Sequence, residues 1–382
     1  MNPIDQLLSR RVAKILPDKE RLKKLLQQRK IRLYQGFDPT GARLHLGHTV
    51  GLRKLMEFAH AGHEVIFLFG TGTVLVGDPS QRHAARKPIT QEEIDANIKD
   101  WQKQVAPIVD FDKVHIRQNG DWLLPLTLKD IIHIASQISA VQLFKRDMFD
   151  RRLKQGDTVF MHETLYPLLQ GYDSVAMDVD LEIGGTDQEF NMLIGRELMR
   201  KMKGKEKFVL TTPMILGTDG HQMSKTSGNC VWLTDTPKDI FGKLMSLPDD
   251  QIDSYRELLT DLSPNTSLNP LAAKKQVALD IVRQFHGAPT AQAAQNHFEA
   301  TIQQGQAPTN IPTFDLSQLS SNTTIVDLLK KAGLVQSRGE AKRLLAQRGV
   351  SINQLPITND QLTNFKPGDI LSIGRRKWLK LI

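Results

Sequence analysis

The sequence predicts an α/β protein with a doubly wound parallel sheet, followed by a helical domain and a small α+β module. Short apolar runs alternate with helical patterns through residues 32–216, which is typical of strands joined by crossover helices. Polar and glycine-rich segments follow the ends of several runs, where parallel sheets bind their ligands. The carboxyl-terminal region has its own helix and strand patterns and an excess of basic residues, which predicts a separate module.

Four short runs are the predicted strands, at residues 32–37, 64–70, 113–119 and 207–216. Helices are predicted between them at about 48–61, 91–106 and 188–203. We therefore expect residues 34–40, 70–80 and 184–188 to lie at or just after strand ends, on the edge of the sheet that carries the site.

Residues 121–165 interrupt this alternation with mainly helical sequence. They mix apolar and polar positions at helical spacing, for example between Gln137 and Phe144. An amphipathic cap on the sheet would explain the pattern, and so would an interface with a second subunit.

A helical region follows the last predicted strand. Asn269 and Pro270 predict a helix start, because asparagine caps helices and proline suits the first turn. Gly287 is expected to end that helix, and a second helix is expected from Thr290 onward. The polar residues 303–324 are a predicted linker.

The composition excludes several classes of protein. Hydrophobic residues make up 40% and charged residues 24% of the 382, which are ordinary globular values. The sequence has no run of eighteen apolar residues, so no membrane span is expected. Cys230 is the only cysteine, which rules out an intramolecular disulfide and makes a reducing cytoplasm the simplest location. The polar start of the chain lacks the apolar core of a signal peptide.

Positive charge is concentrated near the carboxyl-terminal end. The chain carries a net charge of +8, and residues 322–382 hold eleven Lys/Arg against four acidic residues. This asymmetry indicates a module that binds a polyanion, although a solubilising basic tail would give the same excess.

The segment His45-Leu-Gly47-His48 follows a turn signal at 38–40. A helix that begins near His45 would present unpaired N–H groups and its positive dipole end, which favour phosphate. Gly47 lets a nucleotide approach the backbone, and the two histidines share one helical face, from which they can donate to a phosphate in a transition state. A surface or metal-binding histidine pair is the alternative, although no third ligand is evident.

A second motif is the segment Gln222-Met223-Ser224-Lys225-Thr226, which has glycines on both sides, at 217, 220 and 228. Lys225 can supply the charge that a triphosphate needs, and the glycines suggest a loop that closes over a ligand. A flexible surface turn with an ordinary lysine fits the same sequence.

Two further polar segments follow apolar runs. After Asp78, Arg82 and Arg86 are four residues apart and could reach pyrophosphate oxygens, although a solvated charged loop would look the same. In the segment 184–188, Gly185 allows close approach and Asp187 can accept two ribose hydroxyls. A plain turn with a helix-capping aspartate is the alternative there.

Tyr166, Gln170 and Asp173 recur at i, i+4 and i+7 and form one polar stripe on an otherwise apolar helix. Burying such groups is costly unless they are satisfied, so they either form an internal network or bind a polar ligand. Pro167 weakens the assumption that this helix is regular.

In this order over nearly the whole chain, these motifs resemble a tyrosyl-tRNA synthetase, a class I enzyme with a Rossmann-like catalytic domain. The histidine segment and the segment 222–226 match its two signatures, except that Gln222 stands where the second signature usually has a first lysine. A neutral amide donates hydrogen bonds but supplies no charge. Nearby basic residues must therefore compensate, or activation is slower.

The resemblance implies three domains and a homodimer. The catalytic domain is expected at 1–230, with the dimer interface in the insertion 121–165, the helical anticodon-binding domain at 231–318, and an αL-type RNA-binding module at 322–382. The implied reaction joins L-tyrosine to tRNA(Tyr) through tyrosyl-adenylate, with ATP as a substrate. Mg²⁺ would be carried by ATP oxygens, without a dedicated protein site.

The resemblance also assigns roles to individual residues. The implied catalytic residues are His45, His48, Lys225 and Thr40. The implied tyrosine-binding residues are Tyr34 and Asp173 on the phenolic hydroxyl, Tyr166, Gln170 and Asp78 on the α-ammonium, and Asp38 and Gln188 in orientation. The implied ATP-binding residues are Gly36, Gly47, Gly185, Asp187, Met223, Ser224, Lys225, Arg82 and Arg86. A phenol and a carboxylate at the pocket floor would reject phenylalanine, a discrimination already known for this family.

The RNA-binding module is expected to open its helix at Ser337, where Ser337 and Glu340 form a capping-box pattern. A turn at 366–369 is expected to lead into a strand at 370–373. The implied tRNA contacts are Arg338, Lys342, Arg343, Arg348, Arg375 and Arg376. Such phosphate contacts give affinity more than sequence choice.

Three other interpretations remain. A nucleotidyl transferase of the pantothenate-ligase type would share both signatures but would not need Tyr34 with Asp173, or the RNA-binding module. A tryptophan-specific synthetase would give those two residues no phenol to bind. A catalytically weak RNA-binding relative is favoured by Gln222 alone.

Overall fold

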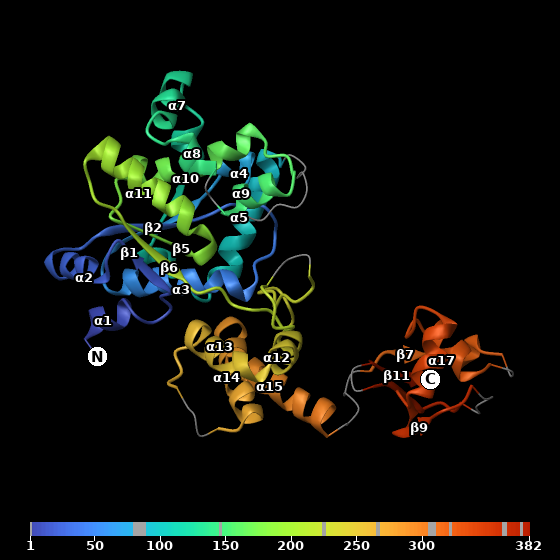
Figure 1. Ribbon diagram of the computed structural model, residues 1–382. Helices are drawn as coiled ribbons and strands as arrows, with labels where there is room; N and C mark the ends of the chain where they lie inside the picture. Colours follow the sequence, from blue (N-terminus) through green and yellow to red (C-terminus); the bar gives the residue numbers. More distant parts are fainter. Residues whose placement is uncertain are drawn as a thin grey trace. The chain divides into compact units, whose positions relative to one another are not determined.

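The structure is a computed structural model, and it describes residues 2–78, 89–144, 147–223, 227–264, 268–304, 311–320, 323–360, 365–374 and 377–382 (Figure 1). The chain divides into two units, Met1–Gly287 and Ala288–Ile382, which we consider separately. None of the described helices has the length and apolar character that crossing a bilayer requires.

Among the described residues of the first unit, six strands form one sheet in the order β1-β6-β5-β2-β3-β4. The strands are β1 Lys14–Leu16, β2 Arg32–Phe37, β3 Glu64–Phe69, β4 His115–Gln118, β5 Leu181–Gly185 and β6 Phe208–Thr212. Strands β2 to β6 are parallel to their neighbours, and β1 pairs with β6 in the antiparallel sense. The predicted parallel sheet is therefore confirmed.

Two of these strands were not among the predicted runs. β1 has only three residues, too few for a pattern to stand out. β5 is short and carries Glu182 among its apolar residues, which interrupts the run. The sequence therefore predicted four of the six strands, and the two that it missed lie on the same side of β2.

The helices of this unit are α1 Pro3–Leu7, α2 Lys19–Gln28, α3 Leu46–His60, α4 Thr73–Val76, α5 Gln91–Val105, α6 Gly120–Leu123, α7 Leu128–Ala135, α8 Ala140–Phe144, α9 Asp147–Lys154, α10 Met161–Met177 and α11 Glu189–Lys203. The three crossover helices that the sequence predicted are confirmed as α3, α5 and α11. The insertion 121–165 is helical, as predicted, over most of α6 to α9 and the start of α10.

Successive side chains of β2 point to opposite faces of the sheet. The Tyr34 hydroxyl lies 3.0 Å from Ser174 Oγ of α10. Gln35 instead faces Gly51 of α3, where an added Cβ would lie 2.3 Å from the Gln35 amide nitrogen. Helices α10 and α11 therefore cover one face of the sheet and α3 covers the other (Figure 1).

Three helices complete the first unit: α12 Pro237–Met245, α13 Ile252–Leu259 and α14 Pro270–His286. Asn269 caps α14 by accepting a hydrogen bond from the backbone of Ala272 at 2.9 Å, and Gly287 ends that helix, both as predicted.

Arg11 joins these helices to the sheet region. Its guanidinium donates to the carbonyl of Leu258 at 2.8 Å and to the carbonyl of Thr260 at 2.6 Å. Arg11 is 2% exposed and pairs with Asp261 at 2.9 Å. Because α13 also contacts α3, the helical region is held against the catalytic sheet by buried polar groups as well as by packing.

The second unit opens with α15 Ala288–Phe298, which confirms the second predicted helix, and continues as a π-helical turn over Glu299–Gln303. Its sheet has the order β7-β11-β10-β8-β9, formed by β7 Thr313–Phe314, β8 Val350–Ile352, β9 Leu355–Ile357, β10 Ile370–Ile373 and β11 Lys377–Leu381. Helices α16 Ile325–Lys331 and α17 Arg338–Ala346 pack against it through a core that includes Leu329, Leu345 and Leu371.

One prediction for this unit is wrong in part. The segment 303–324 was expected to be a linker, but Thr313–Phe314 pairs with β11 as a parallel edge strand. This strand has only two residues and is surrounded by polar sequence, so it leaves no alternating pattern.

Candidate active site

The ends of neighbouring strands bring the predicted polar segments together at one edge of the sheet. Strand β2 leads into Asp38, β3 into Gly70 and Thr73, β4 into Asn119, and β5 into Gln188. This is the carboxyl edge, where a doubly wound sheet binds its ligands.

A hydrogen-bonded network joins three of these strand ends to α10. The Asp38 carboxylate accepts from Thr73 Oγ1 at 2.8 Å and from the Tyr166 hydroxyl at 2.9 Å. Asn119 Nδ2 donates to Thr73 Oγ1 at 3.0 Å and to Asp173 at 3.1 Å. Three residues that the resemblance assigned to tyrosine, Asp38, Tyr166 and Asp173, therefore lie in one network.

Asp173 is held at the bottom of this network. It is 2% exposed, and its second oxygen accepts from Trp122 Nε1 at 2.8 Å. Burial raises the pKa of Asp173 well above its usual value, while the hydrogen bonds from Asn119 and Trp122 oppose that change. The two N–H donors hold both carboxyl oxygens in place, where they can hydrogen-bond a phenol.

The polar stripe of α10 has internal partners, as one of the two alternatives predicted, and the helix continues through Pro167. One atom is the exception. Gln170 Nε2 donates to Glu182 at 3.2 Å, but Gln170 Oε1 is buried and accepts no hydrogen bond from any described residue. Such an acceptor is unfavourable when left alone, so Gln170 Oε1 is the position in the stripe best suited to a ligand.

Tyr34 lies on the same face of the sheet and is fully buried. Its hydroxyl lies 3.0 Å from Ser174, next in sequence to Asp173. Burial raises the pKa of Tyr34 well above its usual value, and the charges of Glu182 and Asp173 add to the effect. The phenol therefore stays neutral and is available as a hydrogen-bonding group.

The segments after α4 and β5 meet at a second polar contact. Gln188 Nε2 donates to Asp78 at 2.9 Å, and Gln188 Oε1 accepts from Asn191 at 3.0 Å. An added Cβ at Gly185 would lie 2.4 Å from Asp187 Oδ1, so only glycine leaves room for the aspartate to fold back over the backbone. Asp78, Asp187 and Gln188 thus form one group beside the first network.

His45 and His48 lie at the amino-terminal end of α3, as predicted. His45 is the N-cap residue, its backbone N–H donates to His48 Nδ1 at 3.2 Å, and the two ring centroids are 3.9 Å apart. An added Cβ at Gly47 would lie 3.0 Å from the His45 ring. Both imidazoles are half-buried at the positive dipole end of a fifteen-residue helix, an arrangement that suits phosphate.

The segment that follows the second signature pairs with the histidine segment. Leu46 N–H donates to the carbonyl of Val231 at 3.0 Å, and Leu233 N–H donates to the carbonyl of Leu44 at 2.9 Å. His45 and Trp232 thereby form an antiparallel bridge. The segment 231–233, which follows the second motif in the chain, is therefore joined to the histidine segment through the backbone at the position of His45.

Asn229 fixes the base of the same loop. Its amide donates to the carbonyl of Gln222 at 3.1 Å and to Asp219 at 2.8 Å. An added Cβ at Gly217 would lie 2.4 Å from the Asn229 side chain, so Gly217 is required by close packing. Met223, next to Gln222, is buried.

Several predicted site residues lie outside the described residues: Arg82, Arg86, Ser224, Lys225, Arg375 and Arg376. Of the other predicted ATP-binding and catalytic positions, Gly36 is exposed at the end of β2, and the Thr40 backbone N–H donates to the carbonyl of Asp38 at 2.7 Å.

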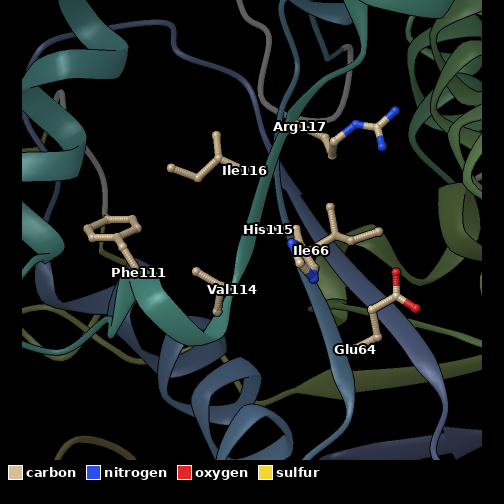
Figure 2. A pocket seen from close by; sticks show the side chains of 7 residues that line it. All are labelled: Glu64, Ile66, Phe111, Val114, His115, Ile116 and Arg117. Carbon is tan, nitrogen blue, oxygen red and sulfur yellow. The ribbon is translucent and has the colours of Figure 1, made fainter.

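An open recess of about 410 Å³ lies along β4, away from these groups (Figure 2). Its lining includes Phe111, Val114 and Ile116, and it includes no predicted site residue. Glu64 and His115, which also line it, begin β3 and β4 at the amino edge of the sheet. This recess is therefore not the candidate active site.

Four of the residues that the resemblance assigned to tRNA lie within the described part of the second unit. Arg338, Lys342 and Arg343 are on α17 and Arg348 follows it, and all four are exposed. Arg338 also pairs with Asp327.

The predicted capping box at α17 is modified. Ser337 Oγ accepts from the backbone of Glu340 at 3.1 Å, but Glu340 accepts from the backbone of Gln336 at 2.7 Å rather than from that of Ser337. The cap still satisfies two backbone donors, and it sets the start of the helix at Arg338.

A family profile described as tRNA synthetases class I (W and Y) matches residues 26–304 of the chain. The chain belongs to the class I tRNA synthetases. The tyrosine–tRNA ligase of Dehalococcoides mccartyi (strain CBDB1) is 40% identical to this synthetase, over 100% of the chain and 99% of that protein. The tyrosine–tRNA ligase of Thermotoga maritima is 39% identical, over 100% of the chain and 98% of that protein.

Solved structures share the fold. The tyrosyl-tRNA synthetase of Archaeoglobus fulgidus, complexed with L-tyrosine, has a TM-score of 0.62 and 21% identity, over 77% of this synthetase and 98% of that chain. A C-terminally truncated mitochondrial tyrosyl-tRNA synthetase of Aspergillus nidulans has a TM-score of 0.65 and 20% identity, over 78% and 93%. These likenesses support the class I fold that the sequence predicted.

The sequence did not point to six residues that the structure places in or behind the site: Thr73, Asn119, Trp122, Ser174, Glu182 and Lys207. Asn119 ends the weakest predicted strand, so the rule that ligands gather at strand ends could have indicated it. Glu182 is a charged residue inside a buried strand, and a buried charge is expected to have a charged or hydrogen-bonding partner.

Proposed function

We propose that this chain is a tyrosine–tRNA ligase, which activates L-tyrosine with ATP and transfers it to tRNA(Tyr). Relatives that carry this name match the chain over its full length at about 40% identity, which supports the activity. The structural observation that carries the proposal is the network of Asp38, Tyr166 and Asp173 at the carboxyl edge of the sheet, together with a helix, shortly after Asp38 in the chain, that begins with two histidines.

In the first step, a carboxylate oxygen of tyrosine attacks the α-phosphorus of ATP. The bond from that phosphorus to the oxygen that bridges to the β-phosphate breaks, and pyrophosphate leaves. His45 and His48 donate hydrogen bonds to the phosphate as its charge is redistributed, and the amino-terminal end of α3 adds its dipole. A terminal ribose hydroxyl of tRNA then takes the tyrosyl group, and AMP leaves.

Tyrosine is held by the α10 face of the site. Tyr34 and Asp173 bind the phenolic hydroxyl, and both are buried, so an unsubstituted phenyl ring would leave them unpaired. Tyr166, Gln170 and Asp78 bind the α-ammonium. Asp38 and Gln188 orient these groups through the bonds from Tyr166 to Asp38 and from Gln188 to Asp78.

ATP is held by backbone approach and by charge. Gly36, Gly47 and Gly185 let the nucleotide lie against the chain, and Asp187 accepts from the ribose hydroxyls. Thr40, Met223, Ser224, Lys225, Arg82 and Arg86 complete the triphosphate side. Mg²⁺ arrives on the ATP oxygens.

The insertion 121–165 forms the interface of a homodimer in this proposal. Many of the exposed large apolar side chains described in the chain lie in or beside it, including Leu124, Leu128, Ile132, Val141, Phe160 and Met161. A cluster of exposed apolar groups on one segment is typical of a subunit interface.

Most of the tRNA is bound outside the proposed catalytic domain, residues 1–230, which only its 3′ end must enter to take the tyrosyl group. We assign the anticodon to the helical domain at 231–318 and further phosphate contacts to the module at 322–382, including the exposed Arg338, Lys342, Arg343 and Arg348. Arg375 and Arg376 are proposed to add to this surface. A cytoplasmic location is part of the same proposal.

Exchange of pyrophosphate into ATP tests the activity, with tyrosine, tryptophan and pantoate assayed separately. Exchange that depends on tyrosine alone is the expected result. Exchange with tryptophan or pantoate instead would favour a different transferase. Tight binding of tRNA without any exchange would identify a catalytically weak RNA-binding relative.

A further inference from the structure

Two oppositely charged side chains are buried together behind Tyr34. Glu182 of β5 is 2% exposed, Lys207 before β6 is 0% exposed, and the two form an ion pair. Lys207 Nζ also donates to the carbonyl of Met192 at 3.1 Å. Neither Glu182 nor Lys207 has a role in the reaction described above.

The helices on this face are arranged around the ammonium. An added Cβ at Gly195 of α11 would lie 2.6 Å from Lys207 Nζ, and one at Gly171 of α10 would lie 3.0 Å from the backbone nitrogen of Gly195. The two glycines therefore let α10 and α11 approach closely and still leave space for Lys207.

Burying this ion pair in the core costs desolvation free energy. Desolvation lowers the pKa of Lys207, and the charge of Glu182 opposes that effect. Apolar side chains of similar volume are often as stable as a buried ion pair, or more stable. Stability alone therefore does not explain why two charges are present at this position.

Glu182 is connected to the substrate side of α10. Its Oε1 accepts from Gln170 Nε2 at 3.2 Å, and its Oε2 lies 3.5 Å from Ser174 Oγ. Tyr34 and Glu182 are also paired residues on neighbouring parallel strands, so their side chains share one face. The pair thus lies directly behind the residues proposed to bind tyrosine.

The chemistry of Glu182 decides which way the Gln170 amide faces. A carboxylate can only accept hydrogen bonds, whereas an amide has one donor end and one acceptor end. Gln170 must therefore turn its NH₂ toward Glu182, and its Oε1 is left buried with no partner among the described residues. An ammonium only donates, so it suits this acceptor end of Gln170.

We propose that Glu182 and Lys207 are positioning residues: the carboxylate holds the Gln170 amide with Oε1 toward the α-ammonium of tyrosine, and Lys207 supplies the charge that lets the carboxylate remain buried. The pair thereby makes the site selective for a free amino group. This inference rests on the proposed function, in which Gln170 binds that ammonium.

Replacing Glu182 with glutamine should invert the amide. In E182Q, Lys207 donates to the oxygen of the new amide, whose NH₂ then faces Gln170. Gln170 must turn its oxygen toward that NH₂ and present its own NH₂ to the substrate ammonium, which is a donor facing a donor.

The test compares two ligands that differ only in the amino group, tyrosinol and 3-(4-hydroxyphenyl)propan-1-ol. Their inhibition constants are measured in tyrosine-dependent pyrophosphate exchange. We expect E182Q to weaken tyrosinol by about tenfold or more, the effect of losing a hydrogen bond to a charged group. The analogue without the amino group should change by less than about twofold.

The chain offers a matched control on α11. Glu197 accepts from Gln142 at 2.8 Å and pairs with Lys201 at 2.8 Å, so it repeats the Gln–Glu–Lys arrangement away from the site. E197Q should leave the ratio of the tyrosinol constant to the constant of the analogue without the amino group unchanged. The double variant E182Q/K207M removes both charges together. Because no ammonium then fixes the oxygen of the new amide, the ratio of the tyrosinol constant to that of the analogue should rise less than it does in E182Q.

The result that overturns the inference is an equal weakening of both ligands in E182Q, or no change in either, because the pair would then only support the fold. Inhibition constants do not depend on the fraction of active enzyme, so partial unfolding cannot imitate the expected result. If the unaltered enzyme shows no tyrosine-dependent exchange, the proposed function fails instead, and the two failures are distinguishable.

Discussion

The two sides of the candidate site are built by different means. On the side proposed to bind tyrosine, side chains from α10 and from the strand ends bond to one another, and Asp173, Tyr34 and Tyr166 are all buried. On the side proposed to bind the triphosphate, the described groups are a helix end, glycine backbones and a loop base. A pre-formed network suits the selection of one amino acid, whereas backbone and helix ends suit a phosphate chain that every substrate shares.

The largest effect is expected from a substitution on the side proposed to bind tyrosine. Replacing Asp173 with alanine removes a phenol partner and leaves Asn119 and Trp122 without their acceptor. We expect kcat/KM for tyrosine to fall by about 10³-fold, and discrimination against phenylalanine to fall with it. Pyrophosphate exchange with each amino acid measures both.

Asp178 offers a control for that variant, since it lies at the end of the same helix, is exposed and faces Lys205. D178A should leave both kinetic values close to those of the unaltered enzyme. Discrimination that stays unchanged in D173A would contradict the assigned pocket.

The next largest effect is expected from a substitution on the side proposed to bind the triphosphate. Replacing His45 with alanine should lower the rate of tyrosine activation by about 10²-fold, because a group that stabilises a developing charge acts mainly in the transition state. The KM for tyrosine should stay nearly constant. Single-turnover formation of the adenylate separates the two, and a rise in that KM as large as the fall in rate would count against the role.

A third prediction concerns His63 near the amino edge of the sheet: the free energy of unfolding should depend on pH through this residue. His63 Nδ1 accepts from the backbone of Ile31 at 3.2 Å, and burial lowers the pKa of His63 to about 4. The unfolded chain binds this proton near pH 6.5, so the stability due to neutral His63 is complete above about 6.5 and is lost as the pH falls toward 4. Between about pH 7 and 5 the loss should be about 2 kcal/mol.

Urea unfolding of the native chain and of H63Q at both pH values measures that loss. The glutamine does not titrate, so the pH dependence should shrink by about the same amount. Equal pH dependence in both proteins would show that His63 does not keep its proton off in the folded state.

The smallest effect is expected from a substitution at Gly217, which tests whether the two sides of the site can be altered separately. An alanine at Gly217 would crowd Asn229, which ties down the backbone of Gln222. We expect the KM for ATP to rise about fivefold, equivalent to roughly 1 kcal/mol, with the KM for tyrosine unchanged. Steady-state kinetics in both substrates would test this, and an equal change in both values would show that the two sides are not separable.

Local sequence carried much of the fold and part of the site. Continuous apolar runs marked β2 and β3, and the spacing of Tyr166, Gln170 and Asp173 placed three polar groups on one helix face. The histidine segment also begins a helix, as predicted.

Other parts depend on contacts that no local pattern encodes. Glu182 and Lys207 meet because β5 and β6 pair in parallel, and the glycines that make room for them lie on two different helices. Asn119 and Trp122 become partners of Asp173 only after β4 and α10 are brought together. Such neighbours are set by topology, and a sequence of this kind shows them only as isolated polar residues.

The bridge between His45 and Trp232 has a mechanical consequence. Only Leu233 to Thr236 separate that bridge from α12, and Lys243 of α12 donates to the carbonyl of Cys230 at 3.1 Å. A displacement of α12 must therefore either be absorbed within four residues or be passed on to the backbone that carries an imidazole. The helical region and His45 are thus linked by a short backbone segment, so a movement of α12 can reach the imidazole that we propose acts on the phosphate.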